Sequence, residues 1–242
     1  MENKLVEERW KTIKQPKVLV AVITSEGNFH CQNSFLGRAL FLHGYYDLII
    51  FENSDTQDNY KKLKYTTHNM PHAIIKRGVT GFDTIGDKIC ANRNLVLKYV
   101  RKHKEYDYVL MLDSDIFPPF ELIPNFLKRK KLDVQSAVCW IELLGQKQAA
   151  WNFFKDDIAN GNASKWLSTR EPKMIKICES GLGCVLFKTD MLKKHKKLNF
   201  YNRTDKKNAP INEDLTFTNN LREKGHDIWL DLQTECAHII NK

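Results

Sequence analysis

The sequence predicts an α/β fold: a mostly parallel central sheet, flanked by helices, in one domain that covers residues 1–242. Short apolar runs rich in β-branched residues lie at 17–24, 47–53 and 107–113, and such runs are typical of strands buried on both faces. Segments with helical spacing separate them, at 35–44 and 85–103. Strand and helix in alternation indicate a doubly wound sheet, in which ligands bind beyond the carboxyl ends of the strands.

The helix at 85–103 is expected to be amphipathic, with its apolar side made by Ile85, Ile89, Val96, Leu97 and Val100. The polar, turn-rich sequence between the second strand and Gly86 predicts no regular element. Beyond Pro119 the pattern changes to a short helix at 121–131 and a strand at 133–142. An aromatic region without clean periodicity follows at 143–173. Core packing is the favoured role for each of Trp140, Trp151 and Trp166. A glycine turn with an apolar strand at 176–192 and a helix ending near Gly225, followed by a strand, complete the chain.

The chain is basic, with a formal net charge of +9, which favours anionic partners such as nucleotides, phosphates, nucleic acid or an acidic membrane surface. Its lysines cluster at 128–131 and 193–197. These clusters are either solvated helix ends or a patch that meets a phosphorylated or lipid-linked acceptor, including a peripheral contact with a membrane. There is no apolar signal core and no run of membrane-spanning length, and the six cysteines form no C-x-x-C pair. We therefore expect a cytoplasmic protein with buried free thiols.

Asp113 and Asp115 flank one serine at the carboxyl end of the third strand, where a ligand is expected. Two carboxylates this close repel each other unless a cation lies between them. Mg²⁺ or Mn²⁺, held jointly with substrate phosphates, suits such oxygen ligands. The alternative is a polar turn before Pro118.

Four segments in order resemble GT-A fold glycosyltransferases, above all the large inverting family 2. They are DLIIFENSD, ICANRNLVLKYV, YDYVLMLDSDIFPP with its D-x-D, and INEDLTFTNNLREKGHDIWLDLQTECAH with its "ED" helix and closing histidine. The resemblance covers roughly Lys17 to His238. It implies a nucleotide-sugar-binding half at about 17–119 and an acceptor-side half at about 120–242. The donor would be a UDP- or GDP-sugar, and the acceptor a carbohydrate, a lipid-linked molecule or a protein.

The resemblance also assigns roles around the D-x-D. Asp115 would be the main ligand of Mn²⁺ or Mg²⁺, Asp113 would contact ribose or a metal-bound water, and His238 would complete the metal or diphosphate site. Arg93 would lie near the diphosphate, where a guanidinium can grip phosphate with two hydrogen bonds. A helix-surface arginine and a structural histidine are the plainer interpretations of Arg93 and His238.

Further residues are expected to contact the nucleotide sugar. Thr24 follows the first strand on the nucleotide side, and Asn53 and Asp55 are placed to bond the base, although both types are also common in turns. Gly181 and Gly183, in ESGLGCVLF, permit close approach of backbone to the donor sugar. The alternative for the two glycines is a tight turn.

Asp214 matches the family's catalytic base and would take the proton of the acceptor hydroxyl as attack proceeds. Glu213 would orient the acceptor or assist. Acidic residues in the first turn of a helix are also favourable on their own account.

The sequence leaves three other functions open as alternatives. A retaining GT-A transferase, similar to retaining mannosyltransferases in its IFPPFELI segment, would give Asp214 another role. A nucleotidyltransferase usually has a basic, glycine-rich loop after the first strand, which ITSEGNFH lacks. A non-catalytic nucleic-acid-binding protein would need aromatic side chains among its basic clusters, and here the two are separate, so no nucleic-acid partner is expected.

Overall fold

A computed structural model describes residues 15–28, 36–39, 42–44, 46–143, 146–204 and 210–238. The strands are β1 (Val18–Thr24), β2 (Tyr46–Glu52), β3 (Ala73–Arg77), β4 (Tyr108–Asp113), β5 (Ile116–Phe117), β6 (Val134–Leu143), β7 (Gln146–Ala149), β8 (Trp151–Asn152), β9 (Met174–Ile177), β10 (Glu179–Ser180), β11 (Cys184–Lys188), β12 (Arg203–Thr204), β13 (Pro210–Ile211) and β14 (Ile228–His238). The helices are η1 (Glu26–Asn28), α3 (Asp58–Thr66), α4 (Ile85–Lys102), α5 (Leu122–Leu127), α6 (Lys155–Ala159), α7 (Asn162–Thr169), α8 (Thr189–Lys194) and α9 (Glu213–Glu223), with a further helical turn at 36–39.

One large sheet, in the order β3-β2-β1-β4-β11-β6-β14-β5, organises the molecule. Strands β1 to β4 run parallel to one another, and β14 runs parallel to β6. Strand β11 lies between β4 and β6 and is antiparallel to both. The predicted mostly parallel sheet is confirmed, with an antiparallel strand at its centre that an apolar run cannot reveal.

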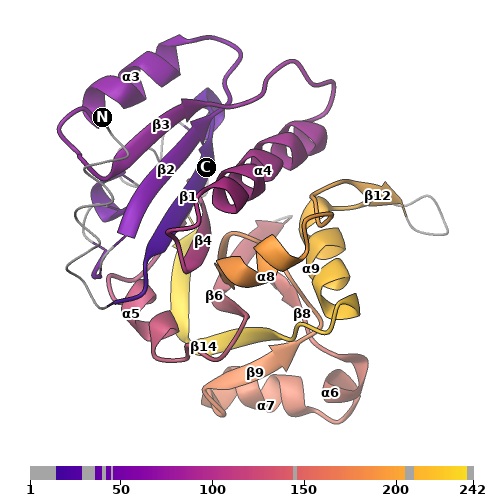
Figure 1. Cartoon of the computed structure of the whole chain (residues 1–242). Helices are drawn as coiled ribbons and strands as arrows, with labels where there is room; N and C mark the ends of the chain where they lie inside the picture. The colour runs from indigo at the N-terminus through magenta and orange to yellow at the C-terminus, as the bar shows by residue number, and fades with distance from the viewer. Residues whose placement is uncertain are drawn as a thin grey trace.

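The sheet is covered on both faces, as alternation along β1 shows. Leu19 and Ala21 join an apolar cluster that includes residues of α4, α8 and α9. Val18, Val20 and Val22 face a second cluster that includes residues of α3 and α5. Figure 1 shows α4 lying across the sheet beside α8 and α9, with the α6–α7 pair at the end of the molecule away from α3. The carboxyl ends of the parallel strands therefore open between two helical layers.

Two predictions about the first half were wrong. Residues between the second strand and Gly86 include α3 and β3, which were missed because every residue of β3 is half-buried or exposed and its apolar run is short. Ile85 is 78% exposed, although it was assigned to the apolar side of α4. It is the first residue of that helix, so its side chain lies beyond the sheet that Val96, Leu97 and Val100 pack against.

The predicted buried free thiols are confirmed at Cys90, Cys139, Cys184 and Cys236, whereas the free thiol of Cys178 is half-buried. Burial raises the pKa of Cys90 to about 11. Cys31, the segment 1–14 and much of the predicted helix at 35–44 lie outside the described residues. Within the described ranges, no helix has both the length and the apolar character needed to cross a bilayer.

Candidate functional site

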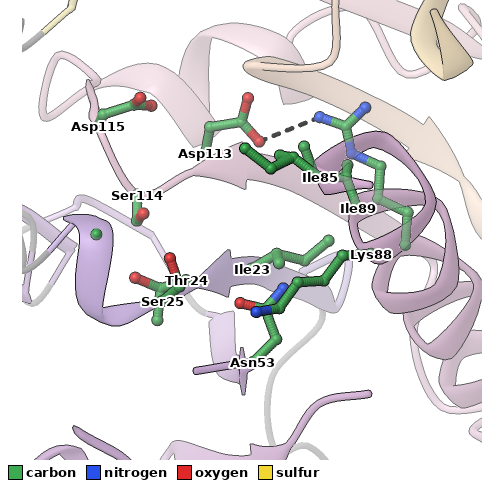
Figure 2. Close-up of a pocket in the computed structure, with 12 residues that line it drawn as sticks. Ile23, Thr24, Ser25, Asn53, Ile85, Lys88, Ile89, Asp113, Ser114 and Asp115 are labelled. Atoms are coloured by element: carbon green, nitrogen blue, oxygen red, sulfur yellow. Dashed lines mark hydrogen bonds and ion pairs between the residues drawn. The ribbon is translucent and has the colours of Figure 1, made fainter. Parts of the chain in front are cut away.

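A cavity of about 460 Å³ opens at the carboxyl ends of β1, β2 and β4. It is lined by Ile23, Thr24, Ser25, Gly27, Asn53, Ile85, Lys88, Ile89, Arg93, Asp113, Ser114 and Asp115. Figure 2 shows Thr24, Ser25 and Asn53 on one side and Asp113 and Asp115 on the other. The edge at which the sequence predicts a ligand is thus hollow, and five of the predicted site residues line it.

Asp115 and His238 meet beside this cavity, although they lie far apart in the sequence. The Nε2 atom of His238 is 3.3 Å from Oδ2 of Asp115. Pairing of β14 with β5, in which His238 is opposite Ile116, brings the imidazole there. The Nδ1 atom of His238 is buried and has no hydrogen-bond partner among the described residues. The structure therefore brings the D-x-D and the closing histidine together, while their joint role at a metal or diphosphate stays a prediction.

The charge on Asp115 is unfavourable in the protein alone. Burial and then the negative charge of Asp113 raise the pKa of Asp115, and the neighbouring His238 only partly offsets them. A divalent cation would relieve both effects, because carboxylate oxygens are preferred ligands of Mg²⁺ and Mn²⁺. Within the described part of the chain, no three His, Cys, Asp or Glu side chains converge on one metal position. Asp115 and His238 thus suit a cation whose other ligands come from phosphate or water.

Arg93 is the centre of the charged network next to the cavity. Its side chain is 6% exposed, and it contacts Oδ1 of Asp113 at 3.3 Å and Oε1 of Glu213 at 3.1 Å. It also forms an ion pair with Asp214. One guanidinium on α4 therefore joins the D-x-D strand to the start of α9, and its donors are directed at carboxylates. Its predicted position next to a diphosphate stays a prediction.

Asp214 and Glu213 begin α9, whose N-cap is Asn212, with its side chain accepting a hydrogen bond from the backbone N–H of Leu215 at 3.1 Å. Oδ2 of Asp214 accepts a hydrogen bond from the backbone N–H of Leu182 at 3.0 Å. Neither acidic residue lines the cavity. Arg93 and the Leu182 N–H thus engage both oxygens of the Asp214 carboxylate.

Gly181, Gly183 and Asp55 also lie outside the cavity lining. A Cβ atom on Gly181 would come within 3.0 Å of the Ala150 carbonyl oxygen, and one on Gly183 within 3.3 Å of Ile116. The two glycines thus permit close packing beside the network. The side chain of Asp55 is 75% exposed and pairs with Lys88 at 3.2 Å, so it lies at the rim.

Two polar groups behind the cavity are buried: Glu52, a strand-end carboxylate of the kind expected near a ligand, and Asn92, which was not predicted. Glu52, which is fully buried at the end of β2, accepts hydrogen bonds from the N–H of Ser54 at 2.8 Å and from Asn59 at 3.2 Å, and it pairs with Arg77. Asn92 is also buried; it accepts from the N–H of Val79 at 2.9 Å and donates to its carbonyl at 3.0 Å. A carboxylate at the end of an apolar strand was the available signal for Glu52, but nothing in the sequence marked its partner.

The aromatic region packs as core, as predicted. Trp151 is buried against Trp140, with ring centroids 5.0 Å apart. The indole N–H of Trp140 donates to Glu235 at 2.9 Å, and Trp166 lies against Phe153.

Solved structures supply the comparison for this fold. GalNAc-T7, solved with UDP, GalNAc and Mn²⁺, aligns over 94% of this chain and 44% of its own at a TM-score of 0.63 and 9% identity. The S. aureus TarS structure 1–349 aligns over 92% of this chain and 60% of its own, at a TM-score of 0.58 and 16% identity. The chain has the GT-A fold. It spans less than two thirds of either neighbour, and at these identities the likeness shows the fold alone.

No protein-family model and no curated protein sequence matches the chain. The GT-A fold thus stands on the structure, while membership of family 2 stays a prediction from the motifs.

Proposed function

We propose that the protein is a metal-dependent glycosyltransferase that moves a sugar from a nucleotide-diphosphate donor to an acceptor hydroxyl. One observation carries the proposal: on a GT-A fold, the cavity at the strand ends has Asp115 on its wall and His238 in contact with Asp115. The Mn²⁺, UDP and GalNAc present with GalNAc-T7 support this donor and metal class.

The donor would lie across the cavity. Asn53 is 4% exposed and its Oδ1 has no hydrogen-bond partner among the described residues, which suits an N–H of a nucleobase. Asp115 and His238 would hold Mn²⁺ or Mg²⁺. When bound, the metal supplies positive charge to the diphosphate as it leaves.

The acceptor oxygen attacks the anomeric carbon, the bond from that carbon to the diphosphate oxygen breaks, and the nucleoside diphosphate departs. In the inverting form Asp214 takes the hydroxyl proton, with Glu213 assisting. Since Arg93 pairs with Asp214, this role needs that contact to loosen when substrate binds. The same contact favours the alternative, a retaining transferase in which Asp214 is not the base. The anomeric configuration of the product, determined by NMR, separates the two.

The test is release of nucleoside diphosphate from UDP- and GDP-sugars, with and without Mn²⁺ or Mg²⁺. We expect metal-dependent release that Asp115→Asn abolishes. Asp156→Asn, an exposed change on α6, is the matched control and should leave release intact. Equal release by Asp115→Asn and the control would refute the metal site. No release from any sugar nucleotide would refute the function.

A further inference from the structure

Exposed lysines from separate segments lie near the amino end of β4, at the end of the strand opposite to the cavity. We call this surface the basic edge; it consists of Lys128, Lys130, Lys131, Lys194, Lys196 and Lys197, all exposed. The two segments meet through Lys188, whose Nζ donates to the carbonyl of Lys131 at 3.0 Å and which directly precedes α8. The clusters that the sequence shows separately thus form one surface.

Carboxylates next to the basic edge are engaged by other cations. Asp133 is bonded to Lys188 at 3.1 Å and to His226 at 2.9 Å, and Asp190 pairs with Lys193 at 3.6 Å. Arg129, between the lysines, pairs with Asp231 at 2.9 Å. These contacts leave the six exposed ammonium groups as the dominant charge of the surface.

His195 lies between Lys194 and Lys196 and is exposed to part of this positive charge. Burial, then the charges of His226, Lys194 and Lys224, lower the pKa of His195. Positive neighbours have that effect because they disfavour the protonated imidazole.

The chemistry of the surface indicates its partner. Lysine carries a point charge that suits a diffuse anionic surface, whereas arginine is the residue that grips single phosphates with two hydrogen bonds. None of the exposed large apolar side chains that the structure describes lies in these segments. The basic edge therefore offers no aromatic side chain on which nucleobases could stack. Each lysine or arginine close to an anionic bilayer gains about 1 kcal/mol from the surface potential of its lipids. We propose that the basic edge docks the protein on the surface of an anionic bilayer.

Docking in this way fixes where the cavity faces. The first turns of α4 line the cavity with Ile85, Lys88 and Ile89, while its other end, at Lys102, leads to Lys104, whose carbonyl accepts from Lys193 of α8 at 3.5 Å. At 1.5 Å per residue the helix is about 27 Å long. The cavity therefore lies that far from the headgroups and opens away from them. If the protein is the proposed glycosyltransferase, this orientation means that the acceptor hydroxyl comes from the aqueous side; that conclusion rests on the proposed function.

The test is co-sedimentation with vesicles of phosphatidylcholine, with or without 30% phosphatidylserine, at low and high salt. We expect binding to the anionic vesicles only, lost at high salt. Replacing Lys194, Lys196 and Lys197 together by Gln should weaken binding at least tenfold, since each lysine contributes about fivefold at such a surface. Lys61, Lys64 and Lys165 lie on α3 and α7 and are also exposed, so their triple Gln variant is the matched control for net charge.

Equal loss in the two triple variants would overturn the proposal, because general net charge would then explain binding. Salt-sensitive binding to a DNA duplex without binding to anionic vesicles would also overturn it and assign the surface to nucleic acid. Circular dichroism of each variant checks folding. The vesicle assay needs no transfer activity, so its result is independent of whether the proposed function holds.

Discussion

Replacing Arg93 by methionine tests the charged network most directly. The variant keeps the length and apolar stem of the side chain and removes the guanidinium that contacts Asp113, Glu213 and Asp214. The side chains of Glu213 and Asp214 are only 10% and 14% exposed, so water cannot replace the lost partner. Leaving such a buried charge unpaired costs about 3–5 kcal/mol. The side chain of Asp113 is 40% exposed, so losing its contact with Arg93 should add little to this loss of stability.

Urea denaturation measures the free energy of unfolding of each variant. Arg170→Met is the matched control, because Arg170 and Glu235 form a pair that is 36% and 42% exposed, and such a pair contributes about 0–1 kcal/mol. Adding Glu213→Gln to Arg93→Met should recover part of the loss, since it removes one unpaired charge. A loss below about 1 kcal/mol for Arg93→Met, with an unchanged denaturant slope, would show that Arg93 does not hold these carboxylates.

Three further predictions concern other parts of the structure. Gly78→Ala should destabilise the fold by about 1–3 kcal/mol in urea denaturation, because the new Cβ would overlap Oδ1 of Asn92 and lie 2.9 Å from Cβ of Asn53; wild-type stability would show that the turn moves freely. Asn53→Ala should weaken binding of a nucleoside diphosphate about 2–10-fold in calorimetry with little change in melting temperature, and unchanged binding would remove Asn53 from the base site. Burial alone would raise the pKa of Asp133, but hydrogen bonds from His226 and a lysine lower it overall. Its contribution to stability is thus present above the unfolded-state pKa and lost as pH falls through the lower folded-state value. Asp133→Asn should therefore flatten the fall in stability below about pH 4, and an equally steep fall in the variant would contradict this.

The strands and helix around the cavity could be predicted because burial on both faces selects unbroken apolar runs. Strands β1, β2 and β4 each carry such a run, and helix α4 shows the spaced apolar residues of an amphipathic helix. Strand β3 does not, since none of its residues is fully buried. The antiparallel direction of β11 depends on the path by which the chain returns to the sheet. The residues of β11 alone do not indicate that path.

The residues of the candidate site also include some that the sequence could predict and some that it could not. Asp113 and Asp115 could be found because they end a buried strand, and His238 because it closes a resembling motif. The partners of Arg93 could not be predicted, because an ion pair between residues 93 and 213 depends on the folded positions of two helices. Asp55 was expected at the base and lies at the rim, since its position one turn beyond β2 carries its side chain into solvent.

The position of His238 on β14 has a consequence for biosynthesis. About 120 residues separate it from Asp115 in the chain. At a translation rate of 5–20 residues per second, the ribosome needs about 6–25 s to cover that distance. During this interval the nascent polypeptide already contains the D-x-D strand, yet it lacks the imidazole that meets Asp115. The contact between Asp115 and His238, and with it the proposed metal site, therefore forms late, when β14 enters the sheet.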